Sequence, residues 1–451
     1  MKKNTILQGV CVDYIHDGAG IVKVDEFAFF VRGVIVGERI KFKVLKLKKT
    51  YGFGKLLEII EISSHRSKPF CEYYEKCGGC QLQHMDKEEQ LRFKHQLVTN
   101  NIQYLGKLNI NVNPVLEGEQ LAYRNKAQFP LTTKPSFAMG FYRLHSNDII
   151  NITKCPIQSD KINQLYSYIK KNLNLHTFSI ALRHILIKHA VATDQIMIVF
   201  VATKDIKNEM KEYVSQLVYD TGVTSVVLNI NERKDNVILG NIEHILYGPS
   251  TIQDQLCNMK FHIASKSFYQ VNPKQTKLLY EKALAYAEID KNDKVIDLYC
   301  GVGTITLFFA KYAKQVIGIE IVEEAIKNAK ENAKINKIDN VEFICSDASA
   351  YVEKLQKEGN HPDIVVIDPP RKGCDNTTIT NIVEMKPNRI VYVSCNPATL
   401  ARDLQKFDQY SYKCTVVQPI DMFPSTYHVE TVVLLSHKKI KEHVKLSCEP
   451  E

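Results

Sequence analysis

The first 62 residues alternate between apolar and polar side chains over short distances, a pattern typical of β-strands. The runs GAGIVKV, FAFFVRGVIV, ERIKFKVLKLKK and FGKLLEII are separated by glycines and charged residues. Four or five strands of this length are enough to form a small barrel. We therefore predict a β-barrel over residues 1–62.

A different pattern begins at about residue 256, where buried strands alternate with helical segments. The apolar runs KVIDLYC, QVIGIE, VEFIC, DIVVID and RIVYVSC are separated by stretches such as VEEAIKNAKENAKIN. This alternation is typical of a doubly wound parallel sheet. Residues 256–451 are therefore predicted to form an α/β domain with a Rossmann-like fold.

The segment between these two parts, residues 63–255, mixes strands and helices without a clear internal boundary. We expect an α+β central domain here, and residues of about 86–116 could pack on the C-terminal domain instead. Three domains agree with the length, because 451 residues are about three times the size of a common single domain.

Composition and charge exclude several classes of protein. Apolar residues make up 45% and charged residues 24% of the chain, so global disorder is excluded. No apolar run approaches the roughly 18 residues that a membrane span needs, and the N-terminus lacks the apolar core of a signal peptide. We expect a cytoplasmic protein that does not contact a membrane. The net charge of +9 permits a polyanionic partner but does not require one.

A run of basic residues lies within the predicted barrel, and two interpretations of it are open. Lys41 and Lys43 would share one strand face, because they alternate with Phe42 and Val44. They could protect a solvated strand edge from pairing, or they could bind an RNA backbone. The run consists of Arg39, Lys41, Lys43, Lys46, Lys48 and Lys49.

A glycine turn and an acidic residue predict a nucleotide-like ligand in the C-terminal domain. Gly301 and Gly303 follow the first strand of that domain, and Glu320 ends the next strand, seventeen residues after Gly303. Such glycines let a ligand approach the backbone, and the acid can bind ribose hydroxyls. Thr306 replaces the third glycine of a dinucleotide fingerprint, which favours S-adenosylmethionine over a nicotinamide cofactor.

Two further acids follow strands of the same predicted sheet. Asp347 either binds the adenine of the cofactor or caps the helix that follows it. Asp368 begins the segment DPPR, in which two prolines make a rigid, extended loop. We expect Asp368 to lie at the carboxyl edge of the sheet, where ligands bind in this fold.

A cysteine and a glutamate near the C-terminus are candidates for catalysis. Cys395 ends the strand RIVYVSC, and Asn396 and Pro397 are a good N-cap and first residue for the next helix. We expect the helix dipole to lower the pKa of the Cys395 thiol. Glu430 precedes an apolar final strand, where a carboxylate is costly unless it is paired or used. The structural alternatives are a buried, inert cysteine and a surface glutamate.

Four other cysteines form a candidate metal site. Cys71, Cys77 and Cys80 lie within ten residues of one another, and Cys155 is the natural fourth ligand. Four thiolates suit either zinc or an iron–sulfur cluster. The Cys-x3-Cys-x2-Cys spacing of radical enzymes is absent, so a structural or RNA-holding site is expected. The remaining cysteines, interpreted as packing or incidental residues, are Cys11, Cys257, Cys300, Cys345, Cys374, Cys414 and Cys448.

Five ordered motifs resemble those of the RNA uracil-5-methyltransferase family. They are FYQVN, DLYCGVGT, DPPRKG, SCNPATLARD and MFPSTYHVETVVLL. The segments GAGIVKV, FVRGVIVGE and YGFGKLLEI resemble a TRAM domain, an OB-like RNA-binding barrel appended to RNA-modifying enzymes. Together the two resemblances cover nearly the whole chain, and they are closest to the enzymes that methylate 23S ribosomal RNA.

The resemblance implies a class I methyltransferase that uses S-adenosylmethionine. In this family the Cys395 thiolate would attack C6 of uracil, C5 would take the methyl group, and Glu430 would remove the C5 proton. The cofactor positions implied are Gln270, Tyr299, Glu320 and Asp368. The implied metal site is a 4Fe–4S cluster, with zinc less favoured, on Cys71, Cys77, Cys80 and Cys155.

The expected partner is RNA, whose target base must leave its stack to react. Phe268 and Tyr269 are candidates to stack on bases, although such aromatic residues are more often buried in the core. Residues 123–126 are candidates for other RNA contacts. We expect a monomer that acts on 23S ribosomal RNA, with transfer RNA as the second candidate. An RNA cytosine-5-methyltransferase and a non-catalytic RNA-binding factor are the alternatives; the former would usually have Pro before its cysteine, where this chain has Ser394.

Overall fold

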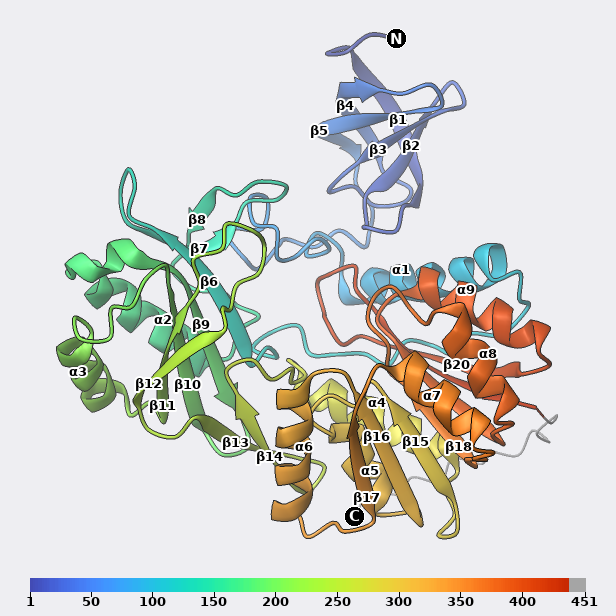
Figure 1. Cartoon of the computed structure of the whole chain (residues 1–451). Coiled ribbons are helices and arrows are strands. Elements are labelled where there is room, and N and C mark those ends of the chain that lie inside the picture. Colours follow the sequence, from blue (N-terminus) through green and yellow to red (C-terminus); the bar gives the residue numbers. More distant parts are fainter. Residues whose placement is uncertain (438–451) are drawn as a thin grey trace. The chain divides into compact units, whose positions relative to one another are not determined.

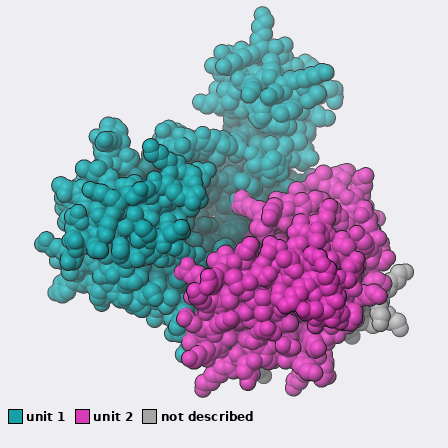
Figure 2. Space-filling view, in the orientation of Figure 1, with its two compact units in different colours: residues 1–97, 115–277, 421–429 teal, residues 98–114, 278–420, 430–451 magenta. Residues whose placement is uncertain are grey.

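The computed structural model describes residues 1–437, and the chain forms two compact units (Figures 1 and 2). Unit 1 contains residues 1–97, 115–277 and 421–429. Unit 2 contains residues 98–114, 278–420 and those from 430 onward. No helix within residues 1–437 is long and apolar enough to cross a membrane.

The N-terminal part of unit 1 is a closed five-stranded barrel, as the alternation of the sequence predicts. Its strands are β1 (Ile6–Tyr14), β2 (Gly20–Val24), β3 (Phe27–Val31), β4 (Arg39–Leu47) and β5 (Tyr51–Glu61), in the order β1-β2-β3-β5-β4. Alternate side chains fill the interior because successive residues of a strand point to opposite faces. The fully buried members are Val22, Phe29, Val31, Ile40, Phe42 and Val44.

The rest of unit 1 is built on a seven-stranded sheet with the order β12-β11-β10-β9-β6-β7-β8. The strands are β6 (Lys126–Thr132), β7 (Ala138–Tyr142), β8 (Ile149–Asn151), β9 (Leu182–Ala190), β10 (Gln195–Ala202), β11 (Ser225–Ile230) and β12 (Ile242–Tyr247). Helices α2 (Asp160–Leu173) and α3 (Lys211–Thr221) share one hydrophobic cluster with this sheet. A 3-10 helix (Thr177–Ala181) precedes β9, and β13 (Thr251–Leu256) and β14 (Met259–Ala264) form a separate hairpin.

Unit 2 has the predicted Rossmann-like sheet, with the order β17-β16-β15-β18-β19-β21-β20. Five strands are parallel: β15 (Lys294–Leu298), β16 (Gln315–Glu320), β17 (Val341–Cys345), β18 (Ile364–Ile367) and β19 (Arg389–Ser394). β20 (Lys413–Ile420) and β21 (Glu430–Ser436) complete the sheet in the antiparallel sense. The helices are α5 (Thr304–Ala310), α6 (Glu323–Ile335), α7 (Ala348–Lys357), α8 (Asn376–Glu384) and α9 (Pro397–Gln409).

Two helices cross the boundaries between the units. α1 (Lys87–Asn100) begins in unit 1 and ends in unit 2, where the π-helical turn Asn101–Leu105 follows it. α4 (Pro273–Ala287) also contributes to both units. The division into domains 1–62, 63–255 and 256–451 stays a prediction, and residues 438–451 of the last one lie outside the described part of the chain.

Candidate active site

The turn after β15 is built from residues with left-handed backbone conformations. Tyr299, Gly301 and Gly303 have φ angles of 67°, 56° and 82°. A Cβ atom on Gly303 would lie 2.8 Å from the ring of Phe343, so packing requires a glycine there. A Cβ atom on Gly301 would meet nothing within 4 Å. The turn therefore leaves open space beside Gly301, where a ligand can approach the backbone.

Glu320 at the end of β16 is held against this turn. Its carboxylate accepts hydrogen bonds from the backbone amides of Gly301, at 3.2 Å, and Val322, at 2.9 Å. The sequence predicted that the glycine turn and the second-strand acid lie together, and unit 2 has this arrangement.

Two further carboxyl groups, those of Asp297 and Asp368, lie at the same edge of the sheet. Asp297 is buried, and the hydroxyl of Thr306 donates to its Oδ2 atom at 2.5 Å. Its Oδ1 atom has no hydrogen-bond partner within residues 1–437. Burial, with Asp368 and Glu320 nearby, raises the pKa of Asp297 to about 7. Burial likewise raises the pKa of Asp368, which directly follows β18, to about 7.

Cys395 and Glu430 stand opposite each other at the ends of two neighbouring strands. Ser394 of β19 pairs with Thr431 of β21 in an antiparallel ladder. Cys395 is the next residue on one strand and Glu430 the preceding residue on the other. Because antiparallel strands run in opposite directions, this register brings the two side-chain positions together. Residues that are 35 positions apart in the sequence thus form one pair.

The expectation of a lowered pKa for the Cys395 thiol is wrong. Asn396 does cap α9 by accepting from the amide of Ala398 at 3.1 Å, and Pro397 is the first helical residue, as predicted. Burial nevertheless raises the pKa of Cys395 to about 11, and the charges of Glu430 and Asp368 add to the effect. Desolvation and two nearby carboxyl groups outweigh the helix terminus because each disfavours the thiolate.

Glu430 is also kept in its neutral form. Its side chain is buried, and burial together with the charge of Asp368 raises its pKa to about 8. The guanidinium of Arg371 acts in the opposite direction on both Glu430 and Cys395. The site therefore combines the thiol of Cys395, the carboxyl groups of Glu430 and Asp368, whose pKa values are raised, and the guanidinium of Arg371.

Side chains of α9 and its N-cap hold the loop that carries Arg371. The backbone oxygen of Arg371 accepts from Asn396 at 3.1 Å and from Thr399 at 3.2 Å. Arg402 donates to the carbonyl oxygens of residues 372 and 374, at 2.9 and 3.1 Å. The buried carboxylate of Asp403 accepts from the amide of residue 374 at 2.8 Å. These bonds fix the loop after Asp368 to the helix that follows Cys395.

Sequence reasoning missed Asp403, although a signal for it was present. In the helix PATLARDLQKF, Leu400, Leu404 and Phe407 form the buried stripe, and Asp403 lies within it. A carboxylate on the apolar face of a helix must be bonded to be tolerated. The charge of Arg371 was also overlooked, because a loop position gives no indication of what its side chain faces.

Asp347 and Tyr299 belong to unit 2, and Asp347 has a defined structural partner. Asp347 caps α7 by accepting from the amide of Ala350 at 3.2 Å, which confirms one of its two predicted roles. Tyr299 is half-buried within the glycine turn. Gln270 belongs to unit 1, where its backbone oxygen accepts from Asn125 at 3.3 Å, so unit 2 does not contain it.

The residues named for RNA contacts differ in exposure. Phe268 is 67% exposed, whereas Tyr269 is buried against Phe261. Tyr123 is buried, and its hydroxyl donates to the backbone oxygen of Pro424 at 3.2 Å. Asn125 is buried as well. Phe268 is therefore the member of this set whose ring is free to stack on a base.

Cys71, Cys77, Cys80 and Cys155 all belong to unit 1, and their thiols influence one another. Burial raises the pKa of Cys80 to about 12, and Cys155, Cys77 and Cys71 contribute to this rise. None of the four is in a disulfide. Within residues 1–437, no three His, Cys, Asp or Glu side chains are grouped closely enough to hold a metal ion. The predicted iron–sulfur cluster is therefore not confirmed by the structure.

The other cysteines vary in burial. Cys11, Cys300 and Cys374 are buried and Cys345 is exposed, which agrees with packing or incidental positions. Cys448 lies outside the described residues.

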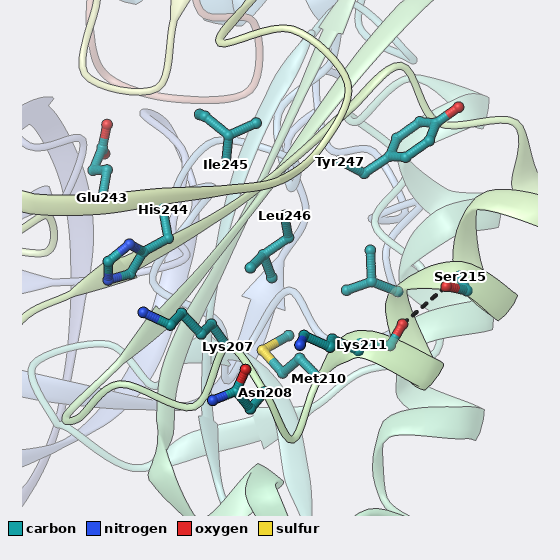
Figure 3. Close-up of a pocket in the computed structure, with 11 residues that line it drawn as sticks. Lys207, Asn208, Met210, Lys211, Ser215, Glu243, His244, Ile245, Leu246 and Tyr247 are labelled. Atoms are coloured by element: carbon teal, nitrogen blue, oxygen red, sulfur yellow. Dashed lines mark hydrogen bonds between the residues drawn. The ribbon is translucent and has the colours of Figure 1, made fainter.

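A surface groove of about 700 Å³ lies elsewhere, between α3 and the edge strand β12 of unit 1 (Figure 3). Lys207 and His244 line it. Lys207 forms an ion pair with Asp205 at 3.3 Å, and a ring nitrogen of His244 lies 3.4 Å from the same carboxylate. None of the predicted site residues contributes to it.

Comparisons with known proteins identify the family of the chain. Residues 86–438 match the family model described as tRNA (uracil-5-)-methyltransferase. A protein of Clostridium acetobutylicum named as an uncharacterized RNA methyltransferase is 44% identical over 449 residues, covering 96% of this chain and 98% of that protein. A Bacillus cereus protein of the same description is 43% identical and covers 97% of each chain.

The solved structure of Pyrococcus abyssi tRNA (uracil-54, C5)-methyltransferase, in complex with S-adenosyl-L-homocysteine, is similar over most of the chain. The TM-score is 0.76 at 26% identity, and the match covers 95% of this chain and 99% of that one. The chain therefore belongs to the tRNA (uracil-5-)-methyltransferase family and is an S-adenosylmethionine-dependent RNA methyltransferase.

Proposed function

We propose that the chain methylates C5 of a specific uridine in RNA, with Cys395 as the nucleophile and Glu430 as the general base. The observation that carries this proposal is the register of β19 and β21, which brings these two residues opposite each other. A thiol and a carboxylate within reach of the same base are the two groups that this reaction needs.

The chemistry balances with these two groups. The Cys395 thiolate adds to C6 of uracil, and the electron pair of the C5–C6 double bond moves toward C5 and the carbonyl at C4. C5 then takes the methyl group of S-adenosylmethionine, which leaves as S-adenosylhomocysteine. Glu430 removes the proton that remains on C5, and the electrons of that bond re-form the double bond as the thiolate leaves C6.

The raised pKa values determine the protonation states of Cys395 and Glu430 in the free enzyme. Near pH 7 the Cys395 thiol, with its pKa of about 11, is protonated, and Glu430, with its pKa of about 8, is largely neutral. A cation favours the ionised form of both groups. S-adenosylmethionine supplies such a cation in its sulfonium, as well as the methyl group. We therefore infer that cofactor binding prepares both groups for reaction.

The residues at the glycine turn fit this cofactor. Gly301 leaves room for a ligand, and Glu320 is oriented by two backbone amides so that its carboxylate can receive ribose hydroxyls. The buried Oδ1 atom of Asp297 is an acceptor without a partner in the described chain. We propose Gln270, Tyr299, Glu320 and Asp368 as the cofactor-binding residues.

For the metal site we propose a 4Fe–4S cluster held by Cys71, Cys77, Cys80 and Cys155, with zinc as the alternative. Their fit rests on the donor set of four thiols in one unit. After burial, Cys71, Cys77 and Cys155 contribute to the raised pKa of Cys80, and Cys71 and Cys77 contribute to that of Cys155. A deprotonated thiol bound to a metal would relieve that penalty. The proposed role is structural, and no step of the methyl transfer uses the cluster.

Large-subunit (23S) ribosomal RNA is the proposed substrate, bound by a monomer in the cytoplasm. The presence of both an N-terminal barrel and four cysteines supports this substrate. Transfer RNA is the second candidate, because the matching family model and the similar Pyrococcus abyssi structure are both named for it.

The test is a trapping experiment with RNA that contains 5-fluorouridine. Fluorine at C5 cannot leave as a cation, so methylation would leave the RNA bound to Cys395. We expect a shifted band on a denaturing gel with 23S transcripts, located at Cys395 by mass spectrometry. The band should disappear in Cys395→Ala and persist in Cys345→Ala, which changes an exposed cysteine of the same unit.

Other outcomes separate the alternatives. A band only with transfer RNA would change the substrate, and a band only with 5-fluorocytidine RNA would indicate cytosine chemistry. No band with any RNA, from folded protein that carries its metal, would favour a non-catalytic RNA-binding factor.

A further inference from the structure

Three aromatic side chains contact one another on the barrel. Phe30 lies on β3, and Tyr51 and Phe53 lie on β5, the strand that pairs with β3 (Figure 1). The ring centroids are 5.1 Å apart for Phe30 and Tyr51, 5.8 Å for Phe30 and Phe53, and 5.6 Å for Tyr51 and Phe53. We call these three residues the aromatic triad.

The aromatic triad is on the outer surface of the barrel. The neighbours of Phe30 along β3, Phe29 and Val31, are fully buried in the interior. Because side chains alternate along a strand, Phe30 points outward. Phe53 is 36% exposed, and Phe30 and Tyr51 are half-buried against it and against each other. Clustered aromatic side chains of this kind usually belong in a core or in an interface.

Lysines surround the aromatic triad without acidic partners. Lys46 is the register partner of Phe53, and Lys43 lies directly opposite Lys55 on the neighbouring strand. No carboxylate within residues 1–437 forms an ion pair with any of these three lysines. Like charges directly opposite each other destabilise a sheet, so the Lys43–Lys55 pair costs stability unless an anion lies between them.

The remaining basic residues of β4 have a different environment. Lys41 forms an ion pair with Glu58 at 3.6 Å, and Arg39 forms one with Glu61 at 2.9 Å. Their charge is compensated within the barrel. Within β4 and β5, the uncompensated charge is therefore that of Lys43, Lys46 and Lys55, beside the rings.

We propose that the aromatic triad and these three lysines bind a single-stranded segment of the RNA substrate. Unpaired bases stack on the rings of Tyr51 and Phe53, and the neighbouring phosphates contact Lys43, Lys46 and Lys55. Aromatic rings next to cations are the combination that binds single strands, because each base has a face that can stack. Bases inside a duplex are already stacked, which excludes paired RNA from the rings. The inference rests on RNA being the substrate, and not on the roles of Cys395 and Glu430.

The test measures binding of the full chain, without cofactor, to a fluorescent single-stranded oligouridylate and to an RNA hairpin of equal length. We expect Tyr51→Ala and Phe53→Ala each to weaken binding of the single strand by about tenfold. Binding of the hairpin should change much less. Tyr51→Phe should bind as the unmodified protein does, and so should Tyr219→Ala, which removes an aromatic ring that is 87% exposed on α3.

The lysines are tested by the salt dependence of the same binding. Exchanging Lys43 and Lys55 together for Gln should reduce the slope of log K against log salt by about 1.4, because each phosphate contact with a single strand contributes about 0.7. The matched control is Lys41→Gln, whose lysine already has Glu58 as a partner. This variant should leave the slope almost unchanged.

A cross-linking measurement makes the result independent of folding defects in the variants. Irradiation of the unmodified protein with an oligonucleotide that carries 4-thiouridine should attach it to residues 51–55. Cross-links that lie outside the barrel, or alanine variants that bind as Tyr219→Ala does, would mean that the triad only stabilises the barrel. If the 5-fluorouridine adduct forms normally in that case, the inference fails and the proposed methylation stands.

Discussion

The phenol of Tyr392 on β19 donates a hydrogen bond to the buried carboxylate of Asp403 on α9, at 2.7 Å. The same oxygen accepts from the backbone amide of Cys374, at 2.8 Å. One carboxylate thus connects the strand that leads to Cys395, the helix that follows it, and the loop that carries Arg371. The position of the cation relative to the thiol depends on this connection.

Asp403→Ala should therefore reduce both stability and turnover. It leaves two buried donors without an acceptor, and each costs about 1–3 kcal/mol, so we expect a loss of about 3 kcal/mol in the free energy of unfolding. The loop would also move, and kcat should fall by about tenfold or more with a smaller change in KM. Urea unfolding and single-turnover methylation measure the two effects.

Asp408→Asn is the matched control on the same helix. Asp408 is paired with Lys413 at 2.7 Å at the surface, and such pairs contribute about 0–1 kcal/mol. If Asp403→Ala were as active as Asp408→Asn, the loop would not depend on the carboxylate.

The second prediction concerns the reactivity of Cys395. Because its pKa is raised to about 11, alkylation by iodoacetamide should be slow near neutral pH and should accelerate up to pH 11. Replacing Glu430 by Gln removes a negative charge above pH 8 and should lower this pKa. Mass spectrometry at Cys395 measures the rate, with the exposed Cys345 as an internal reference for the reagent.

The cofactor provides a further comparison for Cys395. S-adenosylmethionine and S-adenosylhomocysteine have nearly the same shape, but only the first carries a sulfonium charge. We expect the pKa of Cys395 to be lower in the presence of S-adenosylmethionine than in the presence of S-adenosylhomocysteine. Equal alkylation profiles in the two complexes would show that the charge does not act on the thiol.

The Rossmann-like fold, the barrel, the glycine turn and the N-caps were predictable because each depends on local pattern. The alternation of apolar and polar residues determines which face of a strand is buried. Asn396 caps α9 by a hydrogen bond to the backbone two residues further along the chain. The pKa of Cys395 was not predictable in this way. It depends on Glu430 and Asp368, which approach it only through the order of strands in the sheet, and on desolvation, which a sequence does not show.

The third prediction separates the two glycines of the turn. Gly303→Ala would place a methyl group 2.8 Å from the ring of Phe343 at a φ of 82°, and should destabilise unit 2 by about 2–4 kcal/mol. Gly301→Ala meets no neighbour, so its cost is limited to about 1–2 kcal/mol of backbone strain. Its larger effect should be on the cofactor, which loses the space beside the turn.

Calorimetry with S-adenosylhomocysteine and chemical unfolding test both glycine variants. Gly301→Ala should weaken binding by at least tenfold while the protein remains folded. Normal affinity in Gly301→Ala would mean that the open space beside this residue is not the cofactor site.

The fourth prediction is an accumulating intermediate in Glu430→Gln. Without a base for the C5 proton, the methylated adduct cannot release the enzyme, and turnover should fall by about 10²–10⁴. A covalent complex with unmodified RNA should then be visible on a denaturing gel. Glu342→Gln, which changes an exposed glutamate of β17, should form no such complex. Rapid turnover in Glu430→Gln would assign the proton to another base.

Glu430→Gln should also stabilise the protein at high pH, although it removes an active-site residue. The pKa of Glu430 rises from 4.5 to about 8 on folding, so the folded state favours the neutral acid. Below pH 4.5 the carboxyl group is protonated in both the folded and the unfolded state, so the raised pKa does not change the stability. As the pH rises from 4.5 to 8, Glu430 ionises in the unfolded chain but stays protonated in the folded chain, so the free energy of unfolding falls by up to about 5 kcal/mol. Glutamine carries no such penalty, so urea unfolding at pH 9 should require more denaturant for the variant than for the unmodified protein, with little difference at pH 5. A variant that is less stable at both values would mean that the folded state stabilises the charged carboxylate, and the pKa of Glu430 would then lie below 4.5.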